Sequence, residues 1–125
     1  MTQNNTSDKV EVIKFYYESG ALLAETPFVD GMEHGIKKWY YESGALRRES
    51  QYENGKRHGI DKIYYESGTL LVVTPYVRGN IHGIVKIYEA DKSNIVSLTL
   101  YNKGHKVASV KSNIKGDRSW SRIIL

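Results

Sequence analysis

The chain has 125 residues, a formal net charge of +4 and no cysteine. This length fits one domain with a modest core, and the lack of cysteine excludes disulfides, thiolate catalysis and cysteine-based zinc sites. Residues 1–9 lack the apolar segment of a secretory signal, and no run approaches the roughly 18 apolar residues that cross a bilayer, so we expect a cytoplasmic protein.

Residues 1–9 are polar and without periodicity, which predicts a disordered lead-in. From there the chain repeats itself every 24 residues. The sequence Tyr-Tyr-Glu-Ser-Gly follows Phe15, Trp39 and Ile63, and the sequence Gly-x-x-His-Gly begins at Gly31, Gly55 and Gly79. Each unit contains two glycine turns and therefore two short strands. The pattern predicts an all-β fold, a single meandering antiparallel sheet built from three to four 24-residue β-hairpin repeats.

The turn residues predict a strand register. With Ser43–Gly44 and Asn54–Gly55 as two-residue turns, Trp39 lies opposite Arg48, Ser50 opposite Gly59, and Arg48 opposite Asp61. Side chains alternate along a strand, so one face collects an apolar core and the other is solvated. Ser-Gly is a weaker turn signal than Asn-Gly, and a one-residue bulge at that turn would exchange the two faces. The core face would carry Trp39, Tyr41, Leu46, Tyr52, Ile63, Tyr65, Leu70, Val72 and Tyr76, joined by Phe15, Tyr17, Leu22 and Phe28 of the first copy. The solvated face would carry Tyr16, Tyr40, Tyr64 and Tyr88, with Lys14–Glu25 and Lys38–Glu49 as cross-strand ion pairs.

A fourth copy begins at Ile87, but it has lost both turn motifs and is typical of a degenerate terminal cap. We therefore expect the repeat sheet over residues 10–101 and a basic C-terminal cap over residues 102–125. Residues 95–101 and 107–110 keep strand patterns, and Trp120 with residues 123–125 would close the open end of the sheet.

The repeated histidines and glutamates suggest chemistry that the spacing opposes. His34, His58 and His82 recur once per hairpin, which places them about 10 Å apart, too far for one metal ion. A structural role at the turn is the better interpretation. The chain also lacks a phosphate-binding loop and a nucleophile–His–Asp arrangement. We expect no enzyme activity, no cofactor and no metal.

The two repeated motifs resemble the MORN repeat, in the variant found in bacterial antitoxin proteins of the YwqK family. The resemblance covers about residues 12 to 89 and rests on Tyr17, Gly20, Gly31, His34 and Gly35 with their equivalents 24 and 48 positions later. These residues are framework. The resemblance implies an immunity or antitoxin protein that neutralises a cognate toxin by direct binding and occlusion.

Partner-binding residues are expected where the copies differ or where aromatic residues line up. Arg47 and Arg48 replace aliphatic residues of the neighbouring copies, and Arg48 would contact Trp39 through a cation–π interaction. Residues 103–125 hold six basic residues and one acidic residue, a balance of +5. The candidate residues are Tyr16, Trp39, Tyr40, Arg47, Arg48, Tyr64, Lys106, Lys111, Lys115, Arg118, Trp120 and Arg122.

Two other functions fit parts of the same pattern. The basic C-terminal segment could contact anionic phospholipid as part of a MORN-type scaffold. A sheet rich in tyrosine beside a basic segment could also bind nucleic acid, although the tyrosine-rich repeats themselves are not basic. The unpaired edge strands of an open sheet would in addition allow a dimer.

Overall fold

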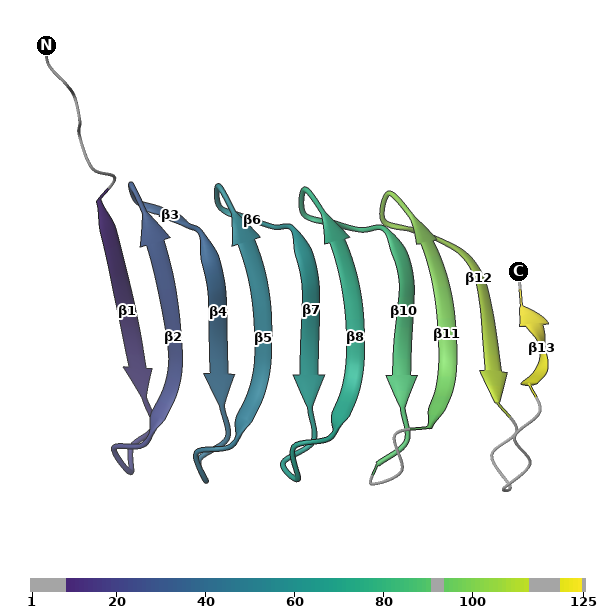
Figure 1. The fold of residues 1–125 in the computed structure, drawn as a ribbon, viewed down its shortest axis with the longest axis horizontal. Helices are drawn as coiled ribbons and strands as arrows, with labels where there is room; N and C mark the ends of the chain where they lie inside the picture. The colour runs from purple at the N-terminus through teal and green to yellow at the C-terminus, as the bar shows by residue number, and fades with distance from the viewer. Residues whose placement is uncertain (1–8, 91–93, 113–119, 125) are drawn as a thin grey trace, which may run out of the picture.

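A computed structural model describes residues 9–90 and 94–112, and the backbone of residues 120–124. Within these residues the chain forms one open antiparallel sheet and contains no helix. The strands stand side by side in chain order, with β1 at one end of the row and β13 at the other, and hairpin turns close both ends of the strands (Figure 1). The all-β meander expected from the 24-residue repeat is confirmed.

Ten long strands form the row: β1 (Val10–Tyr16), β2 (Leu22–Val29), β4 (Gly35–Tyr40), β5 (Leu46–Glu53), β7 (Gly59–Tyr64), β8 (Leu70–Val77), β10 (Gly83–Tyr88), β11 (Ile95–Asn102), β12 (His105–Ser112) and β13 (Trp120–Ile124). Three two-residue strands pair beside the turns at one end of the sheet: β3 (Met32–Glu33), β6 (Lys56–Arg57) and β9 (Asn80–Ile81). The meander thus continues past the third repeat, because β11 and β12 extend it.

The turn after β4 differs from the expected two-residue turn, yet the register of the hairpin is the expected one. The Tyr41 N–H donates to the Ala45 carbonyl (2.8 Å), so the loop has three residues and ends on Gly44 at φ 97°. A β-bulge then places Trp39 opposite Arg48. The extra loop residue and the extra bulge residue compensate each other, so Trp39, Arg48 and the residues farther from the turn stay on their expected faces. Next to the turn the prediction is wrong for Leu46, which was expected on the face of Trp39 and lies opposite Tyr40 instead.

The turn after β5 is the expected two-residue turn, with positive φ at Asn54 and Gly55. Beyond it the predicted register is wrong by two residues. Gly59 adopts φ 112°, and Arg48 lies opposite Ile63 instead of Asp61. The same shift removes the predicted pairing of Ser50 with Gly59. Gly59 pairs only with the strand on its other side, β8, where it lies opposite Tyr76. A shift of two residues leaves the side chains on their faces because strand side chains alternate with period two.

The sheet therefore has two distinct faces. The Trp39 face carries Trp39, Arg48, Ile63 and Val72 in one cross-strand row. The Tyr40 face carries Tyr40 and Tyr64, and the charged row that includes Lys38, Glu49 and Lys62.

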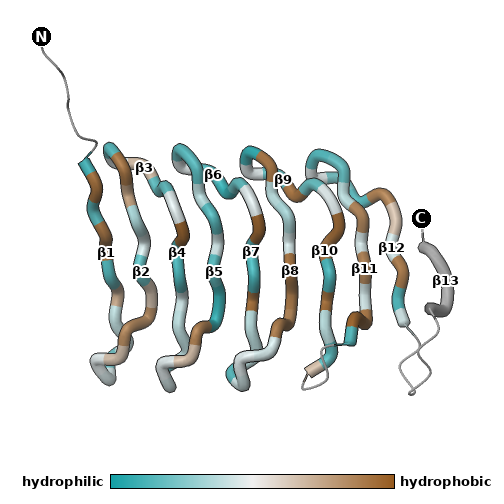
Figure 2. The backbone as a smooth tube through the Cα atoms, in the orientation of Figure 1, coloured by the Kyte–Doolittle hydropathy of each residue, from teal (hydrophilic) through white to brown (hydrophobic). Residues whose placement is uncertain are grey.

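The prediction that one face of the sheet buries large apolar side chains is wrong. Among the residues that the structure describes, the buried side chains other than Ala24 are polar and lie on the Trp39 face: Thr26, Ser50, Asp61, Thr74 and Ser109. Phe15, which was expected in the core, is exposed on the edge strand β1. Conversely, Ile36, Ile60 and Ile84 are exposed on the face expected to be polar. Hydrophobic segments occur on each of the strands β4, β7 and β10 that carry them (Figure 2). A single layer of strands can shield only short side chains in its middle, so large side chains on both faces stay half-exposed.

Two kinds of hydrogen bond join each repeat to the next. The hydroxyls of Tyr17, Tyr41 and Tyr65 donate to backbone carbonyls of the following repeat, at 2.6, 2.6 and 3.0 Å. At the opposite end of the strands, the Nδ1 atoms of His34, His58 and His82 accept backbone N–H bonds from the next turn, at 3.4, 3.1 and 3.1 Å. These structural roles explain why both residue types recur every 24 residues in this chain.

The ends of the chain lie partly outside the described residues. The expected disordered lead-in falls almost wholly on residues 1–8, which are not described. Backbone pairing of β13 with β12 shows that residues 120–124 form a further strand, where a closing apolar segment was expected; the placement of the Trp120 side chain lies outside the description.

No helix among the described residues is long and apolar enough to cross a membrane.

Candidate protein-binding surface

A cluster of alternating cations and aromatic rings occupies the middle of the Trp39 face. Lys37 Nζ lies 4.8 Å from the centre of the Trp39 ring and 5.8 Å from that of Tyr52. The Arg48 guanidinium lies 5.0 Å from the Trp39 ring, the contact that the register predicted. Such contacts orient cationic side chains flat against rings. This cation–aromatic cluster consists of Lys37, Trp39, Arg48, Tyr52, Arg57 and Tyr76.

Arg57 joins the cluster from the short strand β6. Its guanidinium lies between two rings, 5.9 Å from the centre of Tyr52 and 5.4 Å from that of Tyr76. Tyr52 stands opposite Arg57 in the β5–β6 ladder, which places the cation on the Trp39 face. Among the described residues, Arg57 has no carboxylate within ion-pair distance. It is therefore the cation of the cluster that lacks an ion-pair partner in the described part of the chain.

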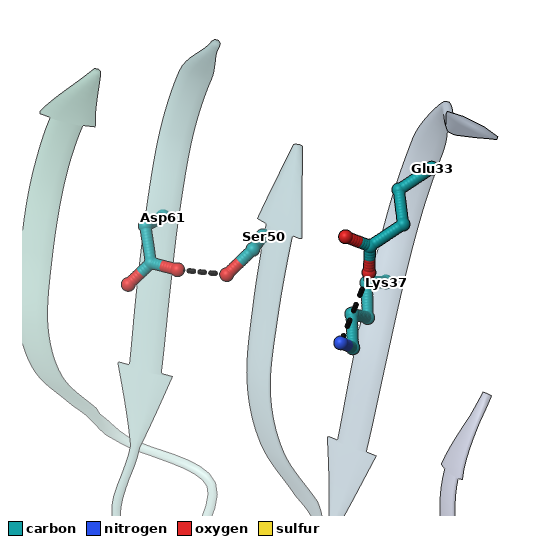
Figure 3. Close-up of polar contacts among 4 residues, drawn as sticks. All are labelled: Glu33, Lys37, Ser50 and Asp61. Atoms are coloured by element: carbon teal, nitrogen blue, oxygen red, sulfur yellow. Dashed lines mark hydrogen bonds and ion pairs between the residues drawn. The ribbon is translucent and has the colours of Figure 1, made fainter. Parts of the chain in front are cut away.

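A buried carboxylate holds Arg48 in place. Asp61 accepts hydrogen bonds from the Arg48 Nε, at 3.0 Å, and from the Ser50 hydroxyl. Ser50 and Asp61 come from the adjacent strands β5 and β7 and point toward each other (Figure 3), and both are buried. A buried carboxylate needs such partners, since leaving it unpaired is costly. The pair with Asp61 fixes the guanidinium over the Trp39 ring.

Lys37 is held in a similar way. Its ammonium forms a 3.0 Å ion pair with Glu33, which precedes it by four residues across the β3–β4 junction (Figure 3). Both partners are half-buried. The cluster is thus preorganised: two of its three cations are pinned by carboxylates of the same chain, and the rings are fixed by the strands that carry them.

The Tyr40 face has a different chemistry. The hydroxyls of Tyr40 and Tyr64 donate to the carboxylates of Glu25 and Glu49, at 2.8 and 2.7 Å. Burial, together with the hydrogen bond and the negative charge of these glutamates, raises the pKa of both Tyr40 and Tyr64 to about 12.

The ion pairs expected on the Tyr40 face do not form, although their strand register is right. Lys14 lies opposite Glu25 and Lys38 opposite Glu49, but neither pair is among the ion pairs within 4.0 Å in the described part of the chain. The carboxylates of these glutamates turn instead to the tyrosine hydroxyls of the next strand pair.

The residues expected to bind a partner do not form one patch. Trp39 and Arg48 lie together in the cation–aromatic cluster. Lys106 and Lys111 are on the same face, but on β12, several strands away. Tyr40 and Tyr64 are on the opposite face, and Tyr16 lies on the exposed edge strand β1.

Of the five other candidate residues, one is described and four are placed only in part or not at all. Arg47 is exposed near the turn after β4, with its guanidinium 5.6 Å from the centre of the Tyr41 ring. Lys115 and Arg118 lie outside the described residues, and Trp120 and Arg122 are known only as backbone positions of β13.

Five residues of this surface were not among the predicted partner-binding residues: Lys37, Tyr52, Arg57, Asp61 and Tyr76. A usable signal existed for Asp61 and Arg57, because these positions differ among the copies: Asp61 corresponds to Lys37 and Val85, and Arg57 to Glu33 and Ile81. The same comparison of copies that singled out Arg48 would have found them. Lys37, Tyr52 and Tyr76 follow from the alternation of faces.

We next consider whether the histidines or the surface pockets could form a metal site or a substrate site. No group of three or more His, Cys, Asp or Glu side chains that could hold a metal occurs among the described residues. A shallow hollow of about 250 Å³ lies beside the turns, lined by Val77, Arg78, Asn80, His82 and Lys103. Its histidine already accepts the Lys103 N–H through Nδ1.

The hairpin array, its 24-residue period and the hydrogen bonds between successive repeats define a repeat protein with a single-layer sheet. A family model for the MORN repeat variant matches residues 12–30, 33–54 and 57–78, together just over half of the chain. The chain belongs to this family. A comparison with curated proteins gives no match.

Proposed function

We propose that the protein is a bacterial immunity or antitoxin protein that neutralises a cognate toxin by binding it, and that the Trp39 face makes the contact. The observation that carries the proposal is the preorganised cation–aromatic cluster on a sheet face that no other part of the described chain covers. The resemblance of the repeats in this chain to those of the YwqK antitoxins supports this role. We further propose that the protein binds its toxin in the cytoplasm, where an intracellular toxin would act.

The composition of the cluster suits protein recognition. Trp, Tyr and Arg are the residue types most enriched among those that dominate binding energy, and rigid rings lose little entropy when bound. The ion pairs of Arg48 with Asp61 and of Lys37 with Glu33 fix these side chains before a partner arrives. Arg57 forms no ion pair with a described residue, so the matching surface of the toxin should present a carboxylate against it.

A role in binding rather than catalysis is supported by the titratable groups. Asp61 is bonded to Arg48 and Ser50, Glu25 and Glu49 accept tyrosine hydroxyls, and the repeat histidines accept turn N–H groups. Groups engaged in this way are poorly placed to move a proton at a substrate. We therefore propose a non-enzymatic protein without a cofactor.

Co-expression with the protein encoded beside it tests the proposal. We expect the chain to rescue the growth of cells that express a toxic neighbour and to co-purify with it. The double variant Trp39→Ala/Arg57→Ala should lose both effects, whereas Lys38→Ala, on the other face of β4, should keep them. Absence of both complex and rescue would remove the proposal, as would binding to anionic vesicles or nucleic acid alone.

A further inference from the structure

The outer strand β1 is an exposed and largely apolar sheet edge. Its seven residues are all exposed, and five of them are large and apolar: Val10 (66%), Val12 (55%), Ile13 (45%), Phe15 (56%) and Tyr16 (59%). The strand contains no proline and only two charged residues, Glu11 and Lys14. Proteins usually protect such an edge with prolines, bulges or many charges, because its free backbone groups invite another strand.

The backbone groups that face outward follow from the pairing with β2. The Asp30 N–H donates to the Lys9 carbonyl, at 2.9 Å, and hydrogen-bonded positions alternate along an antiparallel pair. Glu11, Ile13 and Phe15 therefore bond to β2. The backbone N–H and C=O groups of Val10, Val12, Lys14 and Tyr16 point away from the sheet and have no strand beside them in the described chain.

We propose that β1 pairs with β1 of a second copy of this chain, antiparallel, around a two-fold axis that passes beside Ile13. In this register Ile13 lies opposite Ile13 of the second copy, Val12 opposite Lys14, Glu11 opposite Phe15, and Val10 opposite Tyr16. All four outward-facing residues then meet outward-facing residues, so every free backbone group of the strand finds a partner.

Charge and the number of paired residues favour this register over the other registers that a two-fold axis allows. An axis beside Glu11 would oppose two glutamates, and an axis beside Lys14 would oppose two lysines, both unfavourable. An axis beside Val12 leaves Phe15 and Tyr16 without partners from the strand. The axis beside Ile13 covers all seven residues and places Val10 against the Tyr16 ring, a favourable aromatic–aliphatic pair.

The dimer would change what the protein presents to a partner. A two-fold axis normal to an antiparallel pair keeps each face on its own side, so the two Trp39 faces form one continuous surface with two cation–aromatic clusters. The pairing is closed, because each copy has one β1 edge. This inference does not depend on the proposed function and would hold for any role of the Trp39 face.

Single cysteines in the full-length chain test the register, because the protein has no native cysteine. Under mild oxidation, Ile13→Cys should form a disulfide dimer readily, since directly opposite residues in a non-hydrogen-bonded pair are the closest in a sheet. Val12→Cys should form far less. A higher yield from Val12→Cys, or no cross-link from either variant, contradicts the proposed axis.

Introducing a charged residue at position 13 tests the interface itself. The wild type should have a mass of about 29 kDa in light scattering, twice the 14.3 kDa of one chain. Ile13→Lys and Ile13→Glu should each be monomeric, and an equimolar mixture of the two should recover the dimer. Ile60→Lys, a similarly exposed isoleucine away from the edge, should remain dimeric.

Three results would overturn the proposal. The first is a wild-type protein that stays monomeric at its highest soluble concentration. The second is a dimer that Ile13→Lys leaves intact. The third is an open series of oligomers, which would indicate pairing of β1 with the opposite edge of the sheet.

Discussion

Neighbouring tyrosines of the repeated Tyr-Tyr pair have different tasks. The second tyrosine of each pair, such as Tyr41, donates to a backbone carbonyl of the next repeat. The first, such as Tyr40 and Tyr64, lies on the other face and donates to a glutamate. Adjacent residues of a strand point to opposite faces, so one dipeptide serves both the stacking of repeats and the chemistry of the Tyr40 face.

The stacking role of the second tyrosine predicts a measurable loss. Tyr41→Phe removes the donor to the Tyr64 carbonyl (2.6 Å) and should lower the free energy of unfolding by about 1 kcal/mol. Denaturant titration followed by circular dichroism measures it. Tyr16→Phe, a change on the exposed edge strand, is the control and should be neutral. Equal effects of the two changes would contradict the role assigned to the Tyr41 hydroxyl.

The first tyrosines predict a pH dependence at alkaline pH. Burial and the neighbouring glutamates raise the pKa of Tyr40 and Tyr64 to about 12, from an ordinary value of about 10. The folded state therefore holds these protons more tightly than the unfolded state, and stability that is complete below pH 10 should be lost as the pH rises through about 12.

Two measurements follow from this sign. The absorbance of phenolate should show a late-titrating group of tyrosines, and Tyr40→Phe with Tyr64→Phe should remove it. The same double variant should flatten the decline of the unfolding midpoint between pH 10 and 12. A single titration near pH 10 for all tyrosines of the folded protein would contradict the hydrogen bonds to Glu25 and Glu49.

At the scale of strands and turns, glycines of the two motifs are required for different reasons. Gly44 has φ 97°, and a methyl group there would meet no atom within 4 Å. Gly59 has φ 112°, and a methyl group there would lie 3.0 Å from Cδ and 3.2 Å from Cβ of Gln51. The Gln51 side chain cannot easily move, because its Oε1 accepts the Ile60 N–H at 2.7 Å.

Alanine at these two glycines should therefore differ in cost. Gly44→Ala introduces backbone strain alone, about 1 kcal/mol, whereas Gly59→Ala adds a steric conflict and should cost about 2–3 kcal/mol. Thermal or denaturant unfolding of the two variants measures the difference. If Gly44→Ala proved the more damaging, the close approach of Gln51 would not be the constraint at Gly59.

The turns also show what could be predicted from the sequence. Asn54–Gly55 has the residue chemistry of one defined turn type, and the turn forms as predicted. Ser43–Gly44 does not, and the loop there has three residues with a compensating bulge. The positive φ of Gly59 moves the β5–β7 register by two residues, and no local residue pattern indicates a shift of that kind.

At the scale of the whole molecule, the repeat predicts that a unit can be removed. Deleting residues 36–59 joins Gly35 to Ile60, a junction equivalent to Gly59–Ile60 in the native chain. Because each repeat contacts mainly its neighbours, the shorter chain should remain folded, with a β-type circular dichroism spectrum. Its denaturant m value should fall by about a fifth, in proportion to the residues lost. An unfolded or molten product would contradict the independence of the repeats.

The faces of the sheet were predictable from alternation, but the buried residues were not. Trp39 and Arg48 were expected to meet, and they do. An apolar core was expected around them, yet Ser50 and Asp61 are the residues buried there. Alternation indicates which side chains share a face. It carries no information on whether a second layer covers that face, and without one only short side chains in the middle of the sheet are shielded.

The proposal that the Trp39 face binds the partner is tested most directly by isothermal titration calorimetry, in which the purified cognate toxin is titrated with folded variants of this protein. Trp39→Ala and Arg57→Ala should each weaken binding about 30-fold or more, the size of a dominant contact. Lys38→Ala and Ile36→Ser, on the Tyr40 face of the same strand, should leave the affinity nearly unchanged. Loss of affinity in the Tyr40-face variants, with Trp39→Ala binding as tightly as the wild type, would contradict the assignment.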